Sequence, residues 1–343
     1  MPRLIRSEIE SSILPILRAI PEPLKRILRP VYRRIRPRTK PAPRPKRPWA
    51  FYHQEPEDRR ISALEGRLPD SRVLVVATGP SAKEVLPYDE RLHGRYDAVI
   101  GLNGSVTMIK RLDYFLSVES KACLWDWYHH PLPPEVIRCV SESGIRFARE
   151  SGRPDVQADR SYLLLRHVYE NPPDIRHYRN AAGEEGILVG PKGDTQLGRG
   201  TVTLQSLHFA SMLGAREIHV IGADLHFRGP IQHFYGQHEY GTHEVDGKRY
   251  HRLDVEVRMN PMVTTTHPRS GEIVESTLHF VESAAYIDEV IRGPLTAAGV
   301  TVVDFSDGLL TAARRGDFAT YMESGRIVEP TSEGSPRPLA RAT

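Results

Sequence analysis

The stretch 73-VLVVATGPSAKEV-85 joins an apolar run to an abrupt turn and the start of a helix. Residues 73–77 are small, apolar and largely β-branched, which is typical of a parallel strand covered on both faces. Gly79, Pro80 and Ser81 then form a turn, and helix-forming residues follow. The stretch therefore predicts a buried strand that ends at the carboxyl edge of a sheet, where α/β proteins of this kind bind ligands.

Strand-like and helix-like runs alternate along the rest of the chain. The clearest unit is a helix over 202–213, ended by Gly214, and a strand over 217–221. Further expected elements are strands at 97–102, 114–118 and 300–305, weaker strand candidates at 144–149 and 161–169, and a helix at 278–298. This alternation predicts an α/β, Rossmann-like, doubly wound and mostly parallel sheet.

Composition favours a folded cytoplasmic protein. The chain has 343 residues, of which 39% are hydrophobic, enough for one large domain with a substantial core. Its two cysteines, Cys123 and Cys139, have no CxxC spacing, which favours reduced thiols in the cytoplasm. We find no signal peptide and no apolar run of the roughly 20 residues that a membrane-spanning helix needs.

The positive charge of the chain is concentrated in its first 50 residues. Residues 1–50 hold 14 Lys and Arg against three Glu, whereas the remainder holds 33 basic and 40 acidic residues. A basic patch on the folded body, as expected of a nucleic-acid-binding protein, is therefore not indicated. We expect no nucleic-acid partner.

Three segments are expected. Apolar residues recur at helical spacing among Arg and Lys in 1–36, and a Pro/Arg/Lys linker completes a segment over 1–50. This pattern predicts a basic amphipathic anchor on an anionic membrane surface, at the inner face of the membrane; a partner-docking helix or a poorly ordered tail is the alternative. A nucleotide-binding domain is expected over 60–325, with a lid-like insertion at about 226–276, and a polar tail over 327–343.

Small and polar residues follow several of the expected strands or begin the central helix. They are Asn103, Gly200, Thr201, Thr203, Gly222 and Asp224. Such residues at one edge of a sheet suit a nucleotide. Each also has a structural interpretation: Asn-Gly is a common turn, and "SAKE" at 81–84 fits a capping box in which Ser81 caps the helix.

The stretches at 73–85, 98–106 and 201–225 together resemble a group of two families. One is the bacterial sialyltransferases of glycosyltransferase family 42, and the other is the 6-hydroxymethylpterin diphosphokinase (MptE-like) family, which includes flagellin-modifying proteins. The resemblance implies a Rossmann-like fold that binds CMP-sialic acid without a metal. By position it assigns nucleotide contacts to Gly79, Pro80, Ser81, Asn103, Gly200, Thr201, Thr203, Gly222 and Asp224.

The sequence departs from the sialyltransferases at two points. Thr78 stands where they typically have Asn, and Leu225-His226 stands where they place a tyrosine that assists the departing phosphate. The departures leave the identity of the sugar open. "GADLHF" at 222–227 is closer to the flagellin-modifying and pterin-kinase members.

Three histidines are candidate general bases: His226, His233 and His279. His279 lies roughly where the resemblance places the catalytic histidine. The His-rich stretch from 226 to 251 has spacings that fit no standard metal site, so no metal is predicted there.

These features predict a nucleotide-sugar-dependent glycosyltransferase that uses a CMP-linked acidic sugar, without a cofactor, on a glycan or protein acceptor. One alternative is an ATP-dependent pterin diphosphokinase, which needs Mg²⁺ held by carboxylates such as Asp224 and Glu119. Another is a nucleotide-binding module without turnover.

Overall fold

The computed structural model covers the body of the chain in several stretches. The described residues are 57–119, 122–150, 162–168, 195–197, 201–228, 242–245, 248–251 and 262–329. The predicted segment 1–50, Gly200, His233 and residues 330–343 of the predicted tail lie outside them. So do residues 229–241 and 252–261 of the predicted insertion.

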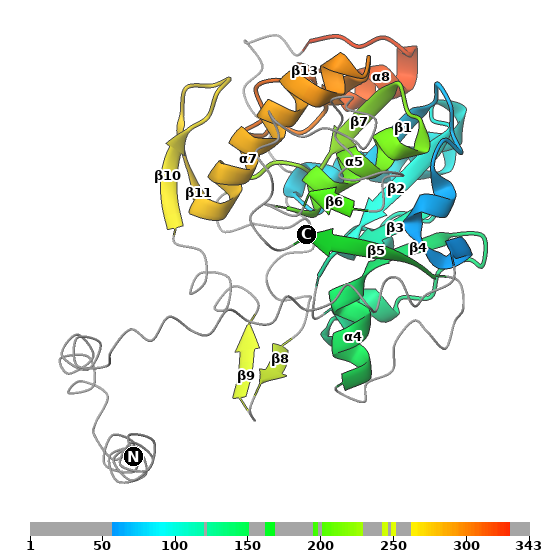
Figure 1. Cartoon of the computed structure of the whole chain (residues 1–343). Helices are drawn as coiled ribbons and strands as arrows, with labels where there is room; N and C mark the ends of the chain where they lie inside the picture. The colour runs from blue at the N-terminus through cyan, green and yellow to red at the C-terminus, as the bar shows by residue number, and fades with distance from the viewer. Residues whose placement is uncertain are drawn as a thin grey trace, which may run out of the picture. The chain divides into compact units, whose positions relative to one another are not determined.

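A nine-stranded sheet forms the centre of the protein, in the order β13-β12-β7-β1-β2-β3-β4-β5-β6. Every pair of neighbouring strands is parallel. The strands are β1 (Arg72–Val76), β2 (Ala98–Leu102), β3 (Tyr114–Ser117), β4 (Ile137–Ser141), β5 (Tyr162–Val168), β6 (Thr195–Leu197), β7 (Glu217–Ile221), β12 (Thr301–Asp304) and β13 (Arg314–Arg315). The predicted Rossmann-like α/β fold is thus confirmed, and its central sheet is parallel throughout (Figure 1).

Helical segments connect the strands. The longer ones are the 3₁₀-helical η3 (Pro80–Gly94) and the α-helices α4 (Glu142–Glu150), α5 (Val202–Leu213), α7 (Leu278–Val290) and α8 (Phe318–Ser324). A π-helical turn, Ile291–Leu295, continues α7. Short 3₁₀ turns occupy Glu57–Arg59, Ile61–Leu64, Asn103–Thr107, Ala122–Leu124 and Asp126–His129.

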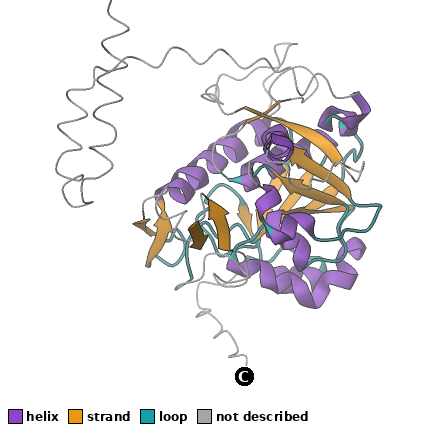
Figure 2. Ribbon diagram, turned by 90° about the horizontal axis from the view of Figure 1, so that it is seen from below, coloured by secondary structure: helices purple, strands orange, loops and turns teal. Residues whose placement is uncertain are grey.

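The apolar run of β1 is explained by burial on both faces of the sheet. Val73 and Val75 join a core that includes residues of α5 and α7. Leu74 and Val76 join a second core that includes residues of η3, α4 and α8. Helices therefore cover both faces, and the strand has no polar side (Figure 2).

The chain changes direction across the sheet next to β1. It moves outward from β1 to β6, and α5 then returns it to β7 on the other side of β1. The carboxyl ends of β1 and β7 therefore form a topological switch point, where doubly wound sheets bind ligands. Gly214 ends α5 with a φ of +103°, and an added Cβ there would lie 3.0 Å from the carbonyl oxygen of Leu68.

Two antiparallel hairpins fall within the predicted insertion. They are β8 (Thr242–Val245) with β9 (Lys248–His251), and β10 (Met262–Thr266) with β11 (Ile273–Thr277). The β10–β11 hairpin lies against the turn after β7, because Phe227 N–H donates to the carbonyl of Glu275 at 2.8 Å. No helix in the described part of the chain is both long enough and apolar enough to cross a bilayer.

One of the weaker strand predictions is wrong. Residues 144–149 belong to helix α4, and the strand of that region is β4 instead. Ile145 and Ala148 are both buried, and their spacing of three residues puts them on one face of the helix. The other weak candidate, at 161–169, is strand β5.

Candidate functional site

The turns after β1 and β7 lie side by side at the switch point and bond to each other through their backbones. Ala77 N–H donates to the carbonyl of Ile221 at 2.8 Å, and Gly79 N–H donates to the carbonyl of Gly222 at 2.7 Å. The ladder between the two strands thus continues past their ends and fixes one turn against the other.

Ser81 and Asp224 connect the same turns through their side chains. The Ser81 hydroxyl donates to Oδ2 of Asp224 at 2.7 Å, and the Ser81 N–H donates to the same oxygen at 3.2 Å. The Ser81 Oγ also accepts from the Gly222 N–H at 3.0 Å. Asp224 is only 1% exposed. The hydrogen-bonding capacity of Ser81 is therefore largely used inside the protein.

Two glycines allow this close approach. An added Cβ at Gly79 would lie 2.2 Å from Oδ2 of Asp224, and one at Gly222 would lie 2.7 Å from the carbonyl oxygen of Ala77. Gly222 also has a φ of +81°, which side chains disfavour. The turn at Gly79 is thus covered by the turn after β7 and by the carboxylate of Asp224.

The start of η3 differs from the predicted capping box. Gly79 is the N-cap and Pro80 is the first helical residue, so Ser81 lies inside the helix and caps nothing. The carboxylate of Asp224 instead accepts the Ser81 N–H. Helix N-termini bind anions, and here a buried anionic side chain already holds that place. The geometry therefore does not favour a ligand phosphate on this turn.

The surroundings of Asp224 include further charges. Arg228 Nη2 lies 2.9 Å from Oδ1 of Asp224 and forms an ion pair with it, in a geometry unsuited to a hydrogen bond. Loss of hydration raises the pKa of Glu84 to about 7, helped by the negative charges of Asp224, Asp317 and Asp307 and opposed by Arg228. The carboxyl edge near η3 thus gathers carboxyl groups.

The N-terminus of α5 is different, because no side chain of the described residues caps it. Thr201 is the N-cap residue, yet its hydroxyl accepts no capping hydrogen bond, and its Oγ1 is buried without a partner. In α7 the equivalent residue, Thr277, does accept the Phe280 N–H at 3.2 Å. Thr203 follows in the first turn of α5 and is buried. The Leu204 N–H donates to the carbonyl of Thr201 at 3.2 Å, but the N–H groups of Val202 and Thr203 have no partner among the described residues, so the α5 N-terminus keeps free donors at the carboxyl edge of the sheet.

Asn103 follows β2 at the same edge. Its φ is +46°, a left-handed conformation that Asn tolerates better than most residues. Its Oδ1 is buried without a hydrogen-bond partner. A buried acceptor of this kind is unusual in a folded protein and is satisfied when a ligand donates to it.

The two candidate histidines in the described residues differ in whether their ring nitrogens have hydrogen-bond partners. Nδ1 of His226 lies 3.0 Å from the Phe227 carbonyl oxygen, and its Nε2 lies 2.8 Å from that of Asp307. Both ring nitrogens face carbonyls, which disfavours a role as general base. His279 lies in the first turn of α7, is half-buried, and makes no hydrogen bond through its ring within the described part of the chain.

A cavity of about 530 Å³ lies near the opposite, amino end of β1, β7 and β12. None of its lining residues was predicted as functional. The sequence does contain one signal: Arg72 and Arg216 stand at or just before the start of buried apolar strands, where a charged side chain remains at the edge.

Metal-ligating side chains do not gather in the described stretches: no group of three or more His, Cys, Asp and Glu there could hold a metal ion. Comparisons with protein-family models, with curated proteins and with solved structures found no match to the chain.

Proposed function

We propose that the protein is a transferase that binds a nucleotide-activated acidic sugar, of the CMP-linked type, at the carboxyl edge of its sheet. The acceptor is a hydroxyl group of a glycan or a protein. The observation that carries the proposal is the uncapped N-terminus of α5, with the unpartnered Thr201 hydroxyl, beside a switch point of a doubly wound sheet. The proposal also takes up the resemblance at 73–85, 98–106 and 201–225.

The donor's phosphate belongs at α5 in this proposal, and not at η3. The N–H groups of Val202 and Thr203, at the start of α5, and the Thr201 hydroxyl can donate to phosphate oxygens. The N-terminus of η3 is excluded because Asp224 accepts there and would repel a second anion. Asn103 Oδ1 accepts from the base, for which the amino group of cytosine is a suitable donor.

His279 is the general base of this proposal. It takes the proton of the acceptor hydroxyl as that oxygen attacks the anomeric carbon of the sugar. The bond from the anomeric carbon to the phosphate oxygen breaks, and the nucleotide leaves with both electrons. Donors at the start of α5 stabilise the negative charge that develops on the phosphate.

The diphosphokinase alternative needs carboxylates to hold Mg²⁺. Asp224 bonds to Ser81 and is paired with Arg228, so it would have to leave these partners. A module without turnover would bind the nucleotide and release no sugar. For all three alternatives the cytoplasm is the proposed location, with residues 1–36 as the proposed membrane anchor.

Calorimetry with CMP, CTP and ATP, each with and without Mg²⁺, tests the proposal. We expect CMP to bind without Mg²⁺, and Thr201→Val and Asn103→Ala each to weaken it about tenfold, since an unmatched polar contact is worth about 1 to 3 kcal/mol. Thr301→Val is the matched control, because it makes the same change at the opposite edge. Equal CMP affinity in all four proteins would reject the site.

A further inference from the structure

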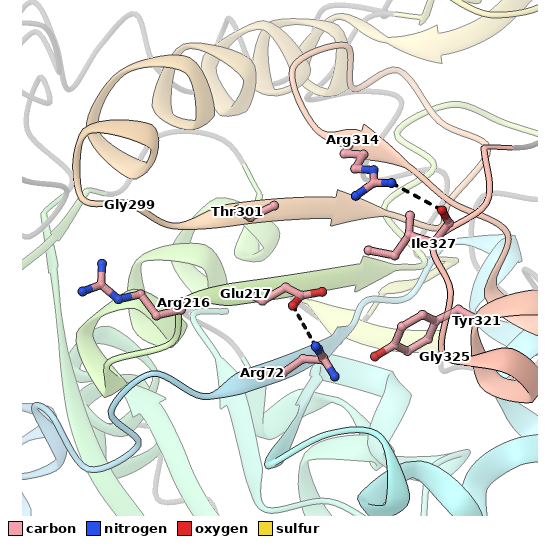
Figure 3. A pocket seen from close by; sticks show the side chains of 9 residues that line it. All are labelled: Arg72, Arg216, Glu217, Gly299, Thr301, Arg314, Tyr321, Gly325 and Ile327. Carbon is pink, nitrogen blue, oxygen red and sulfur yellow. Dashed lines mark hydrogen bonds and ion pairs between the residues drawn. The ribbon is translucent and has the colours of Figure 1, made fainter.

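The cavity near the amino ends of the strands is built from segments far apart in the sequence. Its lining residues are Arg72, Arg216, Glu217, Gly299, Thr301, Arg314, Tyr321, Gly325 and Ile327. Arg72, Glu217 and Thr301 form a row across β1, β7 and β12, because these positions are paired in register. Tyr321 of α8 closes one side (Figure 3). A volume of about 530 Å³ is in the range of small-molecule sites.

Positive charge dominates the lining, which has three arginines and one glutamate. Both carboxylate oxygens of the glutamate already have partners. Oε2 of Glu217 accepts from Arg72 Nη2 at 3.0 Å, and Oε1 lies 2.5 Å from His219 Nε2. These partners, the His219 hydrogen bond first, lower the pKa of Glu217 to about 2. Glu217 and Arg72 thus balance each other, and the other two arginines decide the charge that a ligand would meet.

Those two arginines are held in different ways. Arg216 donates to Asp70 at 2.9 Å, but Asp70 lies outside the lining and is highly exposed, so solvent screens its charge. Arg314 donates to the carbonyl of Ile327 at 3.3 Å, which leaves its charge unneutralised within the described structure. The cavity therefore carries a net positive charge.

Two buried polar atoms of the lining make no hydrogen bond of normal geometry, although the two side chains that carry them interact with each other. They are the Nε of Arg72 and the hydroxyl of Tyr321. A buried polar group that is left unsatisfied destabilises the folded protein. Both groups can donate to an oxygen-bearing anion with better geometry than they offer each other, and such an anion would also match the charge.

We propose that this cavity is a second ligand site, which binds a small-molecule anion bearing a phosphate or carboxylate group. Arg72 and Tyr321 donate to the anion, and Arg314 supplies the charge. Guanidinium groups match both kinds of anion, so the shared feature is a compact oxyanion. The site is separate from the nucleotide site, because it lies near the amino ends of β1, β7 and β12, whereas α5 begins at their carboxyl edge.

Calorimetry of the full chain in a chloride buffer tests the site, with inorganic phosphate, pyrophosphate and citrate as separate probes. We expect at least one probe to bind, Arg314→Gln to weaken it about tenfold and Tyr321→Phe to weaken it several-fold. Arg111→Gln is the control, because it removes one exposed arginine charge, paired with Glu90, outside the cavity. Binding by phosphates alone or by citrate alone identifies the head group.

Two results would overturn the second site. One is no binding of any probe at millimolar concentration. The other is binding that Arg111→Gln weakens as much as Arg314→Gln, which would show a general charge effect. Tyr321→Phe guards against misfolding, because its hydroxyl makes no hydrogen bond of normal geometry and only a weak contact with Arg72, so its loss should change the melting temperature little. CMP affinity that persists in Arg314→Gln would show that the two sites are independent.

Discussion

At the carboxyl edge of the sheet the turns after β1 and β7 bond to each other, whereas near the amino ends of the same strands the side chains surround a cavity. Ser81 and Asp224 fill the space between the turns. Arg72 and Glu217, in register on the same two strands, line the cavity instead. The sheet is continuous between the two edges, so the difference comes from the first residues of the strands at the amino edge and from the turns that follow the strands at the carboxyl edge.

The comparison shows how a glycine turn can be mistaken for a phosphate loop. A glycine next to a helix N-terminus suits an anion, and the protein does place an anion there. That anion is the side chain of Asp224, which arrives from 143 residues further along the chain. A ligand anion can bind only at a helix start whose donors remain free, as we propose for α5.

Substitutions at the two ends of η3 give the largest expected difference in the free energy of unfolding. Gly79→Ala places a Cβ 2.2 Å from Oδ2 of Asp224, whereas Gly94→Ala places one in open space. We expect Gly79→Ala to lower the free energy of unfolding by about 3 kcal/mol, through overpacking. Gly94→Ala should change it by less than about 1 kcal/mol. Urea unfolding followed by circular dichroism measures both.

Gly94→Ala is the matched control, since it makes the same change at the other end of the same segment. If Gly79→Ala were as stable as the wild type, the turns would not be packed as described. The place at the η3 N-terminus would then be open to a phosphate.

Two glutamates respond to pH in opposite directions. Glu217 has its pKa lowered to about 2, chiefly by the hydrogen bond with His219, so its carboxylate stabilises the fold above pH 4.5 and this is lost as pH falls through about 2. Glu84 has its pKa raised to about 7 by loss of hydration, so its carboxylate destabilises the fold increasingly as pH rises from 4.5 through 7.

Unfolding of Glu217→Gln and Glu84→Gln across pH 3 to 8 measures the contrast. Glu217→Gln should lower the free energy of unfolding by about 1 to 3 kcal/mol at neutral pH and by less toward pH 3. Glu84→Gln should become more stable than the wild type as pH rises above 4.5, but only by a small amount, because the Glu84 side chain keeps contact with solvent and its loss of hydration is therefore incomplete. The same sign for both variants at pH 8 would contradict the assigned environments.

Much of the fold could be predicted from local patterns. The expected strands at 73–77, 114–118 and 217–221 correspond to β1, β3 and β7, because strands buried on both faces read as continuous apolar runs. Strand β4 was missed because it contains Arg138, whose guanidinium is buried and donates to the carbonyls of Tyr128 and His130. No pattern in the neighbouring sequence indicates that the side chain of Arg138 is buried.

The candidate site was harder to predict, because its contacts join distant segments. The sequence indicates that Gly79, Ser81 and Asp224 follow strands, but not that they bond to one another. The cavity at the other edge depends on the order of the strands, which brings Arg72 beside Glu217 and Thr301. Strand order is a property of the whole chain and is absent from any short stretch.

Substitutions of two N-cap threonines give the smallest expected difference in the free energy of unfolding. Thr277→Val removes a hydroxyl that accepts the Phe280 N–H, and should cost about 1 kcal/mol. Thr201→Val removes a hydroxyl that caps nothing and has no partner, so the free energy of unfolding should stay nearly constant. Thermal unfolding of the two variants measures this. Equal losses would mean that Thr201 is an ordinary cap and that the α5 N-terminus is not free.

Hydrogen exchange of the full chain, with and without saturating CMP, tests the proposed nucleotide site most directly. The N–H groups of Val202 and Thr203 at the start of α5 have no side-chain cap among the described residues and should exchange rapidly until a phosphate accepts from them. We predict that CMP slows exchange at the start of α5 and around Asn103, and leaves 314–327 unchanged. Unchanged exchange at α5 while CMP is bound, or slowing confined to 314–327, would contradict the account.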